Sequence, residues 1–295
     1  MVRGVVPTVS QRAVTWPEAQ PEGVQVKPFV KWVGGKRQLL PHLLPILLEA
    51  NATGTYHEPF VGGGAVFFAL RNHHRAAKGR LSDINRELLA GYTAIRDSLE
   101  EVIANLKRHE RLSNKEYFYK VRAQSLRKPS EIAARLIYLN KTCFNGLYRV
   151  NNSGGFNAPW GKYDNPTICD ESNLTAVSAT LATVDLEVLP FQTVLEHARA
   201  GDLVYFDPPY VPVSATSHFT EYSAGGFGPK EQEALGSAFR ELDKRNVCVV
   251  LSNSDTPDVR RIYAGFKIAQ VFARRNVNTR ADRRGPVAEV IVRNF

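Results

Sequence analysis

The stretch Leu203-Val204-Tyr205-Phe206-Asp207-Pro208-Pro209-Tyr210 decides the fold expected for this chain. Its first four residues are apolar or aromatic, and they suit a buried parallel strand. The strand must end before Pro208, because proline has no N–H for a sheet and pushes Asp207 into an extended conformation. In open α/β sheets, ligands bind beyond the carboxyl ends of such strands. A strand and an ordinary turn would explain Asp-Pro alone. The whole run predicts a site that holds a planar group carrying an amine.

Length, composition and charge limit the class of protein. The 295 residues allow one large domain or two modest ones, and 43% hydrophobic with 23% charged residues is ordinary for a globular protein. A net charge of +9 and a pI of about 9.5 favour a polyanionic partner without proving one. The three cysteines are widely spaced, which indicates neither a disulfide framework nor a zinc site. We find no signal peptide and no run near the ~20 apolar residues of a membrane span, so we expect a soluble, cytoplasmic protein.

A first glycine turn follows an aromatic residue near the start of the expected fold. It reads Lys31-Trp32-Val33-Gly34-Gly35-Lys36. It is not a phosphate-binding loop, because Arg37 stands where that motif needs Ser or Thr after the lysine. The aromatic face of Trp32 and the cation of Lys36 suit a nucleobase or a carboxylate ligand. A simple turn into the helix expected at 38–49 is the alternative.

A second glycine turn and a later aspartate form another candidate site. The run Glu58-Pro59-Phe60-Val61-Gly62-Gly63-Gly64 ends a short strand and opens an apolar helix. Glycine lets the backbone approach a ligand closely, and the start of a helix offers free N–H groups. Asp83 ends the next expected strand, where Rossmann-like folds bind ribose hydroxyls. A helix N-cap is the alternative role for Asp83.

The middle of the chain interrupts the α/β pattern. Residues 86–139 read as charged helices, and a stretch rich in amides follows, with a hairpin turn at Asn152-Ser153-Gly154-Gly155. We therefore expect a flexible extension at 1–26, a catalytic domain made of 27–85 and 173–295, and an inserted target-recognition domain at 86–172. The polar loop at 211–228 has the length of a mobile lid.

These motifs, in this order, resemble the Dam-like (D12 class) adenine-specific DNA methyltransferases. The resemblance covers residues 28–295 and includes a match to the target-recognition hairpin of that family. It implies a Rossmann-like methyltransferase sheet with an inserted helical and β-hairpin DNA-recognition domain. It also implies S-adenosylmethionine as cofactor and double-stranded DNA as partner, with no membrane and no obligate protein partner. The cofactor contacts that it implies are Trp32, Lys36, Phe60, Gly62, Gly64, Asp83 and Asp207.

The resemblance also suggests how DNA is read. It places Arg149 against guanine and Leu147 and Pro159 against thymine, with Asn151 in the same hairpin, and it favours the site GATC. The chemistry agrees, because arginine can donate two hydrogen bonds to O6 and N7 of guanine, and apolar groups suit the thymine methyl. A phosphate contact is the alternative role for Arg149.

The catalytic residues expected are Asp207, Pro208, Pro209 and Tyr210. The Asp207 carboxylate and the Pro208 carbonyl would accept the two amino hydrogens of a flipped-out adenine, while the ring of Tyr210 stacks on the base. The Pro208-Pro209 pair fixes the direction of the backbone carbonyls. The chain has no cysteine in the Pro-Cys context that a cytosine-ring methyltransferase needs, and it lacks the metal-binding motifs of a zinc deaminase. The alternatives are amino-group methylation at another DNA sequence, of RNA or of protein glutamine, and DNA binding without catalysis.

Overall fold

The computed structural model describes residues 25–32, 34–151, 154–210, 227–274 and 286–295. Almost all of the expected extension at 1–26 and of the expected lid at 211–228 lies outside these ranges, so both stay predictions. Among the residues described, no helix has the length and apolar character needed to cross a membrane.

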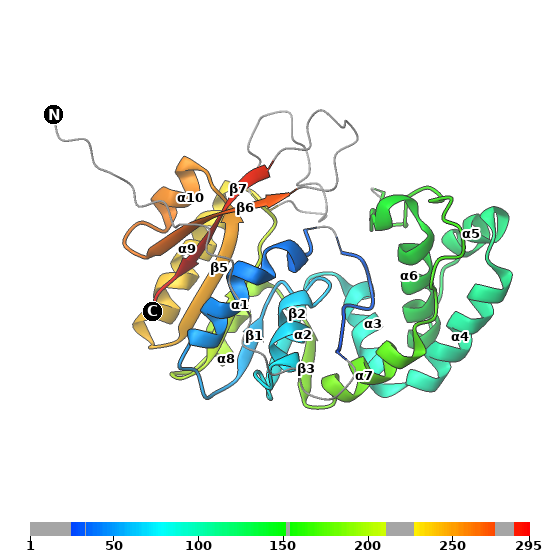
Figure 1. Cartoon of the computed structure of the whole chain (residues 1–295), viewed down its shortest axis with the longest axis horizontal. Coiled ribbons are helices and arrows are strands. Elements are labelled where there is room, and N and C mark those ends of the chain that lie inside the picture. The colour runs from blue at the N-terminus through cyan, green and yellow to red at the C-terminus, as the bar shows by residue number, and fades with distance from the viewer. Residues whose placement is uncertain (1–24, 33, 152–153, 211–226, 275–285) are drawn as a thin grey trace.

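A twisted, mostly parallel sheet forms the body of the protein (Figure 1). Within the described residues its seven strands follow the order β3-β2-β1-β4-β5-β7-β6. Neighbours from β3 to β5 pair in parallel, whereas β7 is antiparallel to both β5 and β6. This confirms the α/β fold with a central parallel strand. The strands are β1 (Tyr56–Glu58), β2 (Gly79–Asp83), β3 (Val184–Val188), β4 (Leu203–Phe206), β5 (Cys248–Ser254), β6 (Lys267–Arg274) and β7 (Pro286–Arg293).

The central strand β4 is apolar throughout because both faces of the sheet are covered. All four of its residues are buried, and successive side chains point to opposite faces. Leu203 and Tyr205 join a core that includes residues of α1 (Leu40–Glu49) and α2 (Ala65–Asn72). Val204 and Phe206 join a second core with α8 (Val194–His197), α9 (Pro229–Lys244) and α10 (Pro257–Ile262).

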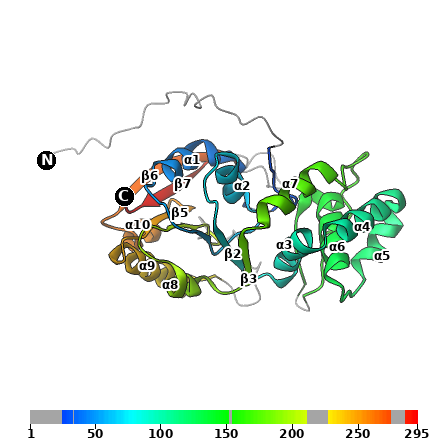
Figure 2. The ribbon, with the colours of Figure 1, turned by 90° about the horizontal axis from the view of Figure 1, so that it is seen from below.

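The helices between β2 and β3 gather into a lobe beside the sheet (Figures 1 and 2). Several begin at a residue whose side chain accepts a hydrogen bond from the first turn, as Asn85, Asn114 and Asp170 do. These side chains explain where the helices start. The helices of the lobe are α3 (Arg86–Asp97), α4 (Leu99–Leu112), α5 (Lys115–Arg122), α6 (Pro129–Thr142) and α7 (Glu171–Leu181).

The segment between α6 and α7 contains the expected hairpin, and we call residues 143–161 the arm. Its described part pairs through two isolated antiparallel bridges, Cys143 with Trp160 and Val150 with Phe156. The N–H of Asn151 donates to the carbonyl of Gly155 at 2.9 Å, while residues 152–153 of the expected turn lie outside the described residues. In the described residues the two sides of the arm are therefore joined by isolated bridges and not by two regular strands, and the expected turn itself stays a prediction.

Candidate active site and DNA-recognition arm

The carboxyl ends of the parallel strands bring the candidate residues to one edge of the sheet. Glu58 ends β1, Asp83 ends β2, Asp207 follows β4, and Ser252 lies in β5. Lys36 reaches this edge from the turn before α1, with its side chain almost fully buried. Residues far apart in the sequence thus meet where ligands bind in open α/β sheets.

Asp207 is held by a cation and a hydroxyl. Its Oδ1 lies 2.7 Å from Lys36 Nζ and accepts a hydrogen bond of 3.2 Å from Ser252 Oγ. The hydroxyl of Tyr205, 2.8 Å from Ser252 Oγ, extends this network into the core. Burial raises the pKa of Asp207 to about 6, although Lys36 and Ser252 both act to lower it. The carboxylate is therefore ionised at neutral pH and loses its charge in mildly acidic solution.

The ring of Tyr210 is fixed beside this carboxylate. Its hydroxyl donates to Glu289 Oε2 on β7 at 3.0 Å, and Lys36 Nζ lies 4.4 Å from the ring centroid. The carbonyl of Pro209 accepts a hydrogen bond of 3.1 Å from Gln232 of α9. Lys36 thus contacts both the carboxylate and the aromatic face that we expected to hold the base. We had assigned it only to the cofactor.

Glu58 is a buried acid that the sequence presented only as part of a motif. Its Oε2 accepts a hydrogen bond of 2.8 Å from the hydroxyl of Tyr56, and it is 2% exposed. Burial, helped by the negative charge of Asp207, raises the pKa of Glu58 to about 8, although the hydrogen bond from Tyr56 acts to lower it. Glu58 is therefore mainly protonated at neutral pH.

Asp83 and the second glycine turn are joined directly. The N–H of Gly62 donates to Asp83 Oδ2 at 3.2 Å, and the N–H of Asn85 donates to Oδ1 at 3.0 Å. Asn85, not Asp83, caps α3, because its side chain accepts from the N–H of Leu88. The alternative role of Asp83 as a helix cap is therefore wrong. Burial raises the pKa of Asp83, while these N–H groups oppose that rise.

The two glycine turns meet through Trp32. Gly62 has a φ of +47°, and a Cβ there would lie 2.8 Å from Trp32 Cδ1, so a side chain would be both strained and crowded. Gly64, with a φ of +70°, opens α2 and lies against Tyr92. Phe60 points elsewhere. It stacks on Phe191 with ring centroids 5.4 Å apart. Both rings pack in the core on the face of the sheet that α9 covers.

The arm presents most of the expected DNA-contacting residues to solvent. Arg149, Asn151 and Pro159 are exposed, and Leu147 is half-buried. The Arg149 guanidinium donates to the carbonyl of Asn157 at 2.9 Å, which holds it against the opposite side of the arm. Phe144, which sequence reasoning missed, is 45% exposed at the base of the arm. An exposed aromatic ring suits stacking on a base.

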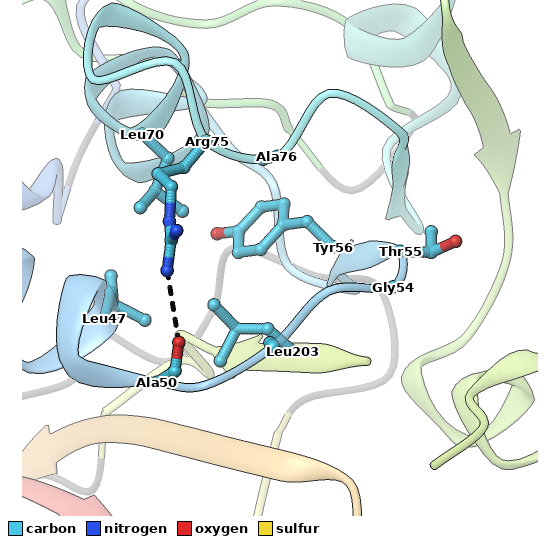
Figure 3. Close-up of a pocket in the computed structure, with 10 residues that line it drawn as sticks. Leu47, Ala50, Gly54, Thr55, Tyr56, Leu70, Arg75, Ala76 and Leu203 are labelled. Carbon is cyan, nitrogen blue, oxygen red and sulfur yellow. Dashed lines mark hydrogen bonds between the residues drawn. The ribbon is translucent and has the colours of Figure 1, made fainter. Parts of the chain in front are cut away.

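A recess at the opposite edge of the sheet is not the candidate site (Figure 3). It lies where β1 and β4 begin, and the Arg75 guanidinium donates to the carbonyl of Ala50 at 3.2 Å within it. Its other lining residues include no Asp, Glu, His or Lys. Among the residues described, no group of three or more His, Cys, Asp or Glu side chains could hold a metal ion.

Comparison with known proteins agrees with this geometry. The family model described as "D12 class N6 adenine-specific DNA methyltransferase" matches residues 32–277. The chain is 41% identical over 289 residues to the type II methyltransferase M.MjaIII of Methanocaldococcus jannaschii, covering 92% of this chain and all of that protein. It is 39% identical over 284 residues to the type II methyltransferase M1.LlaDCHI of Lactococcus lactis subsp. cremoris, covering 94% of this chain and 98% of that protein. It is 33% identical over 269 residues to a DNA adenine methylase of Vibrio cholerae, covering 89% of this chain and 94% of that protein. The chain therefore belongs to the D12 class of N6 adenine-specific DNA methyltransferases.

Proposed function

We propose that this enzyme transfers a methyl group from S-adenosylmethionine to the exocyclic amino group of an adenine flipped out of double-stranded DNA, within the site GATC. The observation that carries the proposal is the arrangement of Asp207 and Tyr210 at the end of β4. A partly accessible carboxylate and an aromatic ring fixed by Glu289 stand side by side there. The family membership supports adenine as the base.

The residues around the glycine turns fit this cofactor. Trp32 packs on Gly62 in a space that any Cβ would fill, and Gly62 is tied to Asp83. The Asp83 carboxylate has lone pairs that its two hydrogen bonds from backbone N–H groups do not use. It can therefore accept hydrogen bonds from ribose hydroxyls. Ile84 follows it and is 59% exposed, which leaves an apolar surface for a ring. When bound, S-adenosylmethionine supplies an electrophilic methyl group on a sulfonium sulfur.

Asp207 and the Pro208 carbonyl act on the adenine amino group. Flipping the base costs about a few kcal/mol, which stacking on Tyr210 would partly offset. Two acceptors for the amino hydrogens localise the nitrogen lone pair for attack. Lys36 now occupies the space between Asp207 and the Tyr210 ring, so it must move aside when a base enters. Positioning by such groups contributes up to roughly 7–11 kcal/mol in favourable cases.

The arm supplies sequence reading in this proposal. Arg149 would donate to guanine, Leu147 and Pro159 would contact thymine methyl groups, and Asn151 would support the same edge. Three of these four residues are exposed and available to DNA. The preference for GATC rests on the family resemblance of the hairpin and not on a contact in the protein alone.

The proposal is tested by methyl transfer from labelled S-adenosylmethionine to duplex DNA, single-stranded DNA, RNA and protein. We expect Asp207→Ala to abolish transfer to duplex DNA while DNA is still bound. Asp97→Ala, at an exposed aspartate of the lobe, is the matched control. Turnover by Asp207→Ala within about tenfold of wild type, which is roughly 1.4 kcal/mol of barrier, would refute the assignment. Sequencing the methylated DNA then gives the site, and methylated adenines mainly outside GATC would discard that specificity alone.

A further inference from the structure

The arm sends neighbouring side chains in opposite directions where it carries its candidate base contacts. Leu147 has extended backbone angles, and alternate side chains of an extended chain lie on opposite sides. Arg149 is exposed, whereas Tyr148 is only 7% exposed and points into the protein. The same short segment therefore faces both the surroundings and the interior.

The inward side chain contacts the cofactor side of the site. The ring of Tyr148 stacks on Trp32, with ring centroids 5.0 Å apart and an angle of 27° between the planes. Trp32 also packs against Gly62 and Gly63 of the second glycine turn. Trp32 thus lies between the arm and the turn that we assign to the cofactor.

A partly buried ion pair holds the hydroxyl end of the Tyr148 ring. The Tyr148 hydroxyl donates to Glu87 Oε2 at 2.8 Å, and Arg135 Nη1 donates to Glu87 Oε1 at 2.7 Å. Arg135 also donates to the carbonyls of Val121 and Arg122. The three linked side chains, Tyr148, Glu87 and Arg135, all belong to the lobe or the arm. The ring is therefore held by the lobe and pressed on Trp32.

One buried amide ties the same two parts together at the backbone. Asn140, fully buried at the end of α6, accepts from the N–H of Lys31 at 2.7 Å and donates to the carbonyl of Lys31 at 2.7 Å. Its amide also donates to the carbonyl of Gly146 at the base of the arm, at 3.0 Å. Figure 1 shows the segment before α1 running between the sheet and the lobe. A displacement of the arm is therefore transmitted to the residues next to Trp32.

Resting on the proposed function, we propose that Tyr148 is a positioning residue that couples DNA recognition to cofactor binding through its stack on Trp32. An arm seated on its DNA site holds Trp32 against the glycine turn, and a cofactor that fixes Trp32 favours the seated arm. Coupling of this kind is reciprocal, so each ligand raises the affinity for the other by the same factor. An aromatic pair of this kind limits that factor to about 2- to 10-fold.

The test compares two affinities measured by calorimetry on the full-length protein. The probe is S-adenosylhomocysteine, which cannot react, with and without a short duplex carrying the site found by sequencing. The coupling factor is the ratio of the two dissociation constants. We expect wild type to give about 2- to 10-fold, and Tyr148→Leu to give a factor near one. Trp160→Phe alters the arm on its other side, where it packs on Phe118, and should keep the wild-type factor.

Two results would overturn the coupling. They are a factor of one in wild type, and an unchanged factor in a Tyr148→Leu protein that unfolds at the wild-type temperature. If the leucine variant does not fold, Tyr148→Met also removes the ring from Trp32, and an unchanged factor in that variant overturns the proposal. Tyr148→Phe keeps the ring and loses only the hydroxyl bond to Glu87, so it should keep most of the wild-type factor. A wild-type protein that binds S-adenosylhomocysteine but methylates no DNA would instead refute the proposed function.

Discussion

Ser252→Ala tests whether the network behind Asp207 sets the pH range of the enzyme. Ser252 Oγ donates to Asp207 Oδ1 at 3.2 Å and acts to lower a pKa that burial has raised to about 6. Hydrogen bonds to charged groups contribute about 1.5–3 kcal/mol, and this one is long, so we take the lower end. Since one pH unit corresponds to about 1.4 kcal/mol, losing the bond should raise the pKa of Asp207 by about one unit.

The sign follows from the role of the carboxylate. In the proposed role, Asp207 must be ionised to accept hydrogen bonds from the amino group, so we expect activity to fall as pH drops through its pKa. We expect the acid limb of the kcat/KM profile to move about one pH unit towards neutrality in Ser252→Ala, with little loss at alkaline pH. Ser237→Ala, at an exposed serine of α9, is the control. An acid limb that stays in place, or moves towards acid, would refute the reasoning.

Further predictions concern stability, cofactor and sequence preference. The pKa of Glu58 is near 8 in the folded protein against an ordinary 4.5, so the native state holds an extra proton between these values and stability falls as pH rises through that window. Urea unfolding at both ends should show a smaller fall in Glu58→Gln, and equal falls would contradict the burial argument. Gly62→Val should lose most affinity for S-adenosylhomocysteine in calorimetry, because Gly62 has a positive φ and lies against Trp32. Asp83→Ala should lower the same affinity by about tenfold or more, because it removes the acceptor of the ribose hydroxyls. Wild-type affinity in Asp83→Ala would remove that role. Arg149→Ala should relax the guanine position by about 1–3 kcal/mol in competition methylation; equal weakening of all sequences would indicate a phosphate contact.

The features that the sequence predicted depend on local patterns. The β4 strand and its end at Pro208 follow from an apolar run and a residue that cannot continue a sheet. The glycine turns and the position of Asp83 follow from similar short signals. By contrast, β6 was not anticipated, since it pairs only with β7 at the edge of the sheet and carries exposed residues such as Phe272. Edge strands lack the continuous apolar run that marks a central strand.

The groups that fix the proposed catalytic residues could not be predicted, because they come from strands joined only in the folded sheet. Glu289 reaches Tyr210 because β7 inserts antiparallel between β5 and β6. Ser252 reaches Asp207 because β5 lies beside β4. Lys36 was assigned to the cofactor from its motif, yet its pairing with Asp207 requires the turn before α1 to fold over the sheet edge. A motif gives the residue type and not its partner.

The segment before α1 connects the proposed cofactor side of the site to the lobe by hydrogen bonds. Its backbone at Val26, Lys27 and Lys31 is satisfied by Asn72 of α2, Asn173 of α7 and Asn140 of α6. Each asparagine both accepts from the N–H and donates to the carbonyl of the same residue, as a neighbouring strand would.

Because α2 packs on the sheet while α6 and α7 belong to the lobe, this segment is bonded to both parts of the protein. Breaking these partly buried bonds would cost free energy, so a shift of the lobe strains them. Trp32 follows directly after Lys31, so its position depends on both the sheet and the lobe. Its contact with Tyr148 then adds the arm to the same connection, and the coupling proposed above becomes a consequence of where the chain passes.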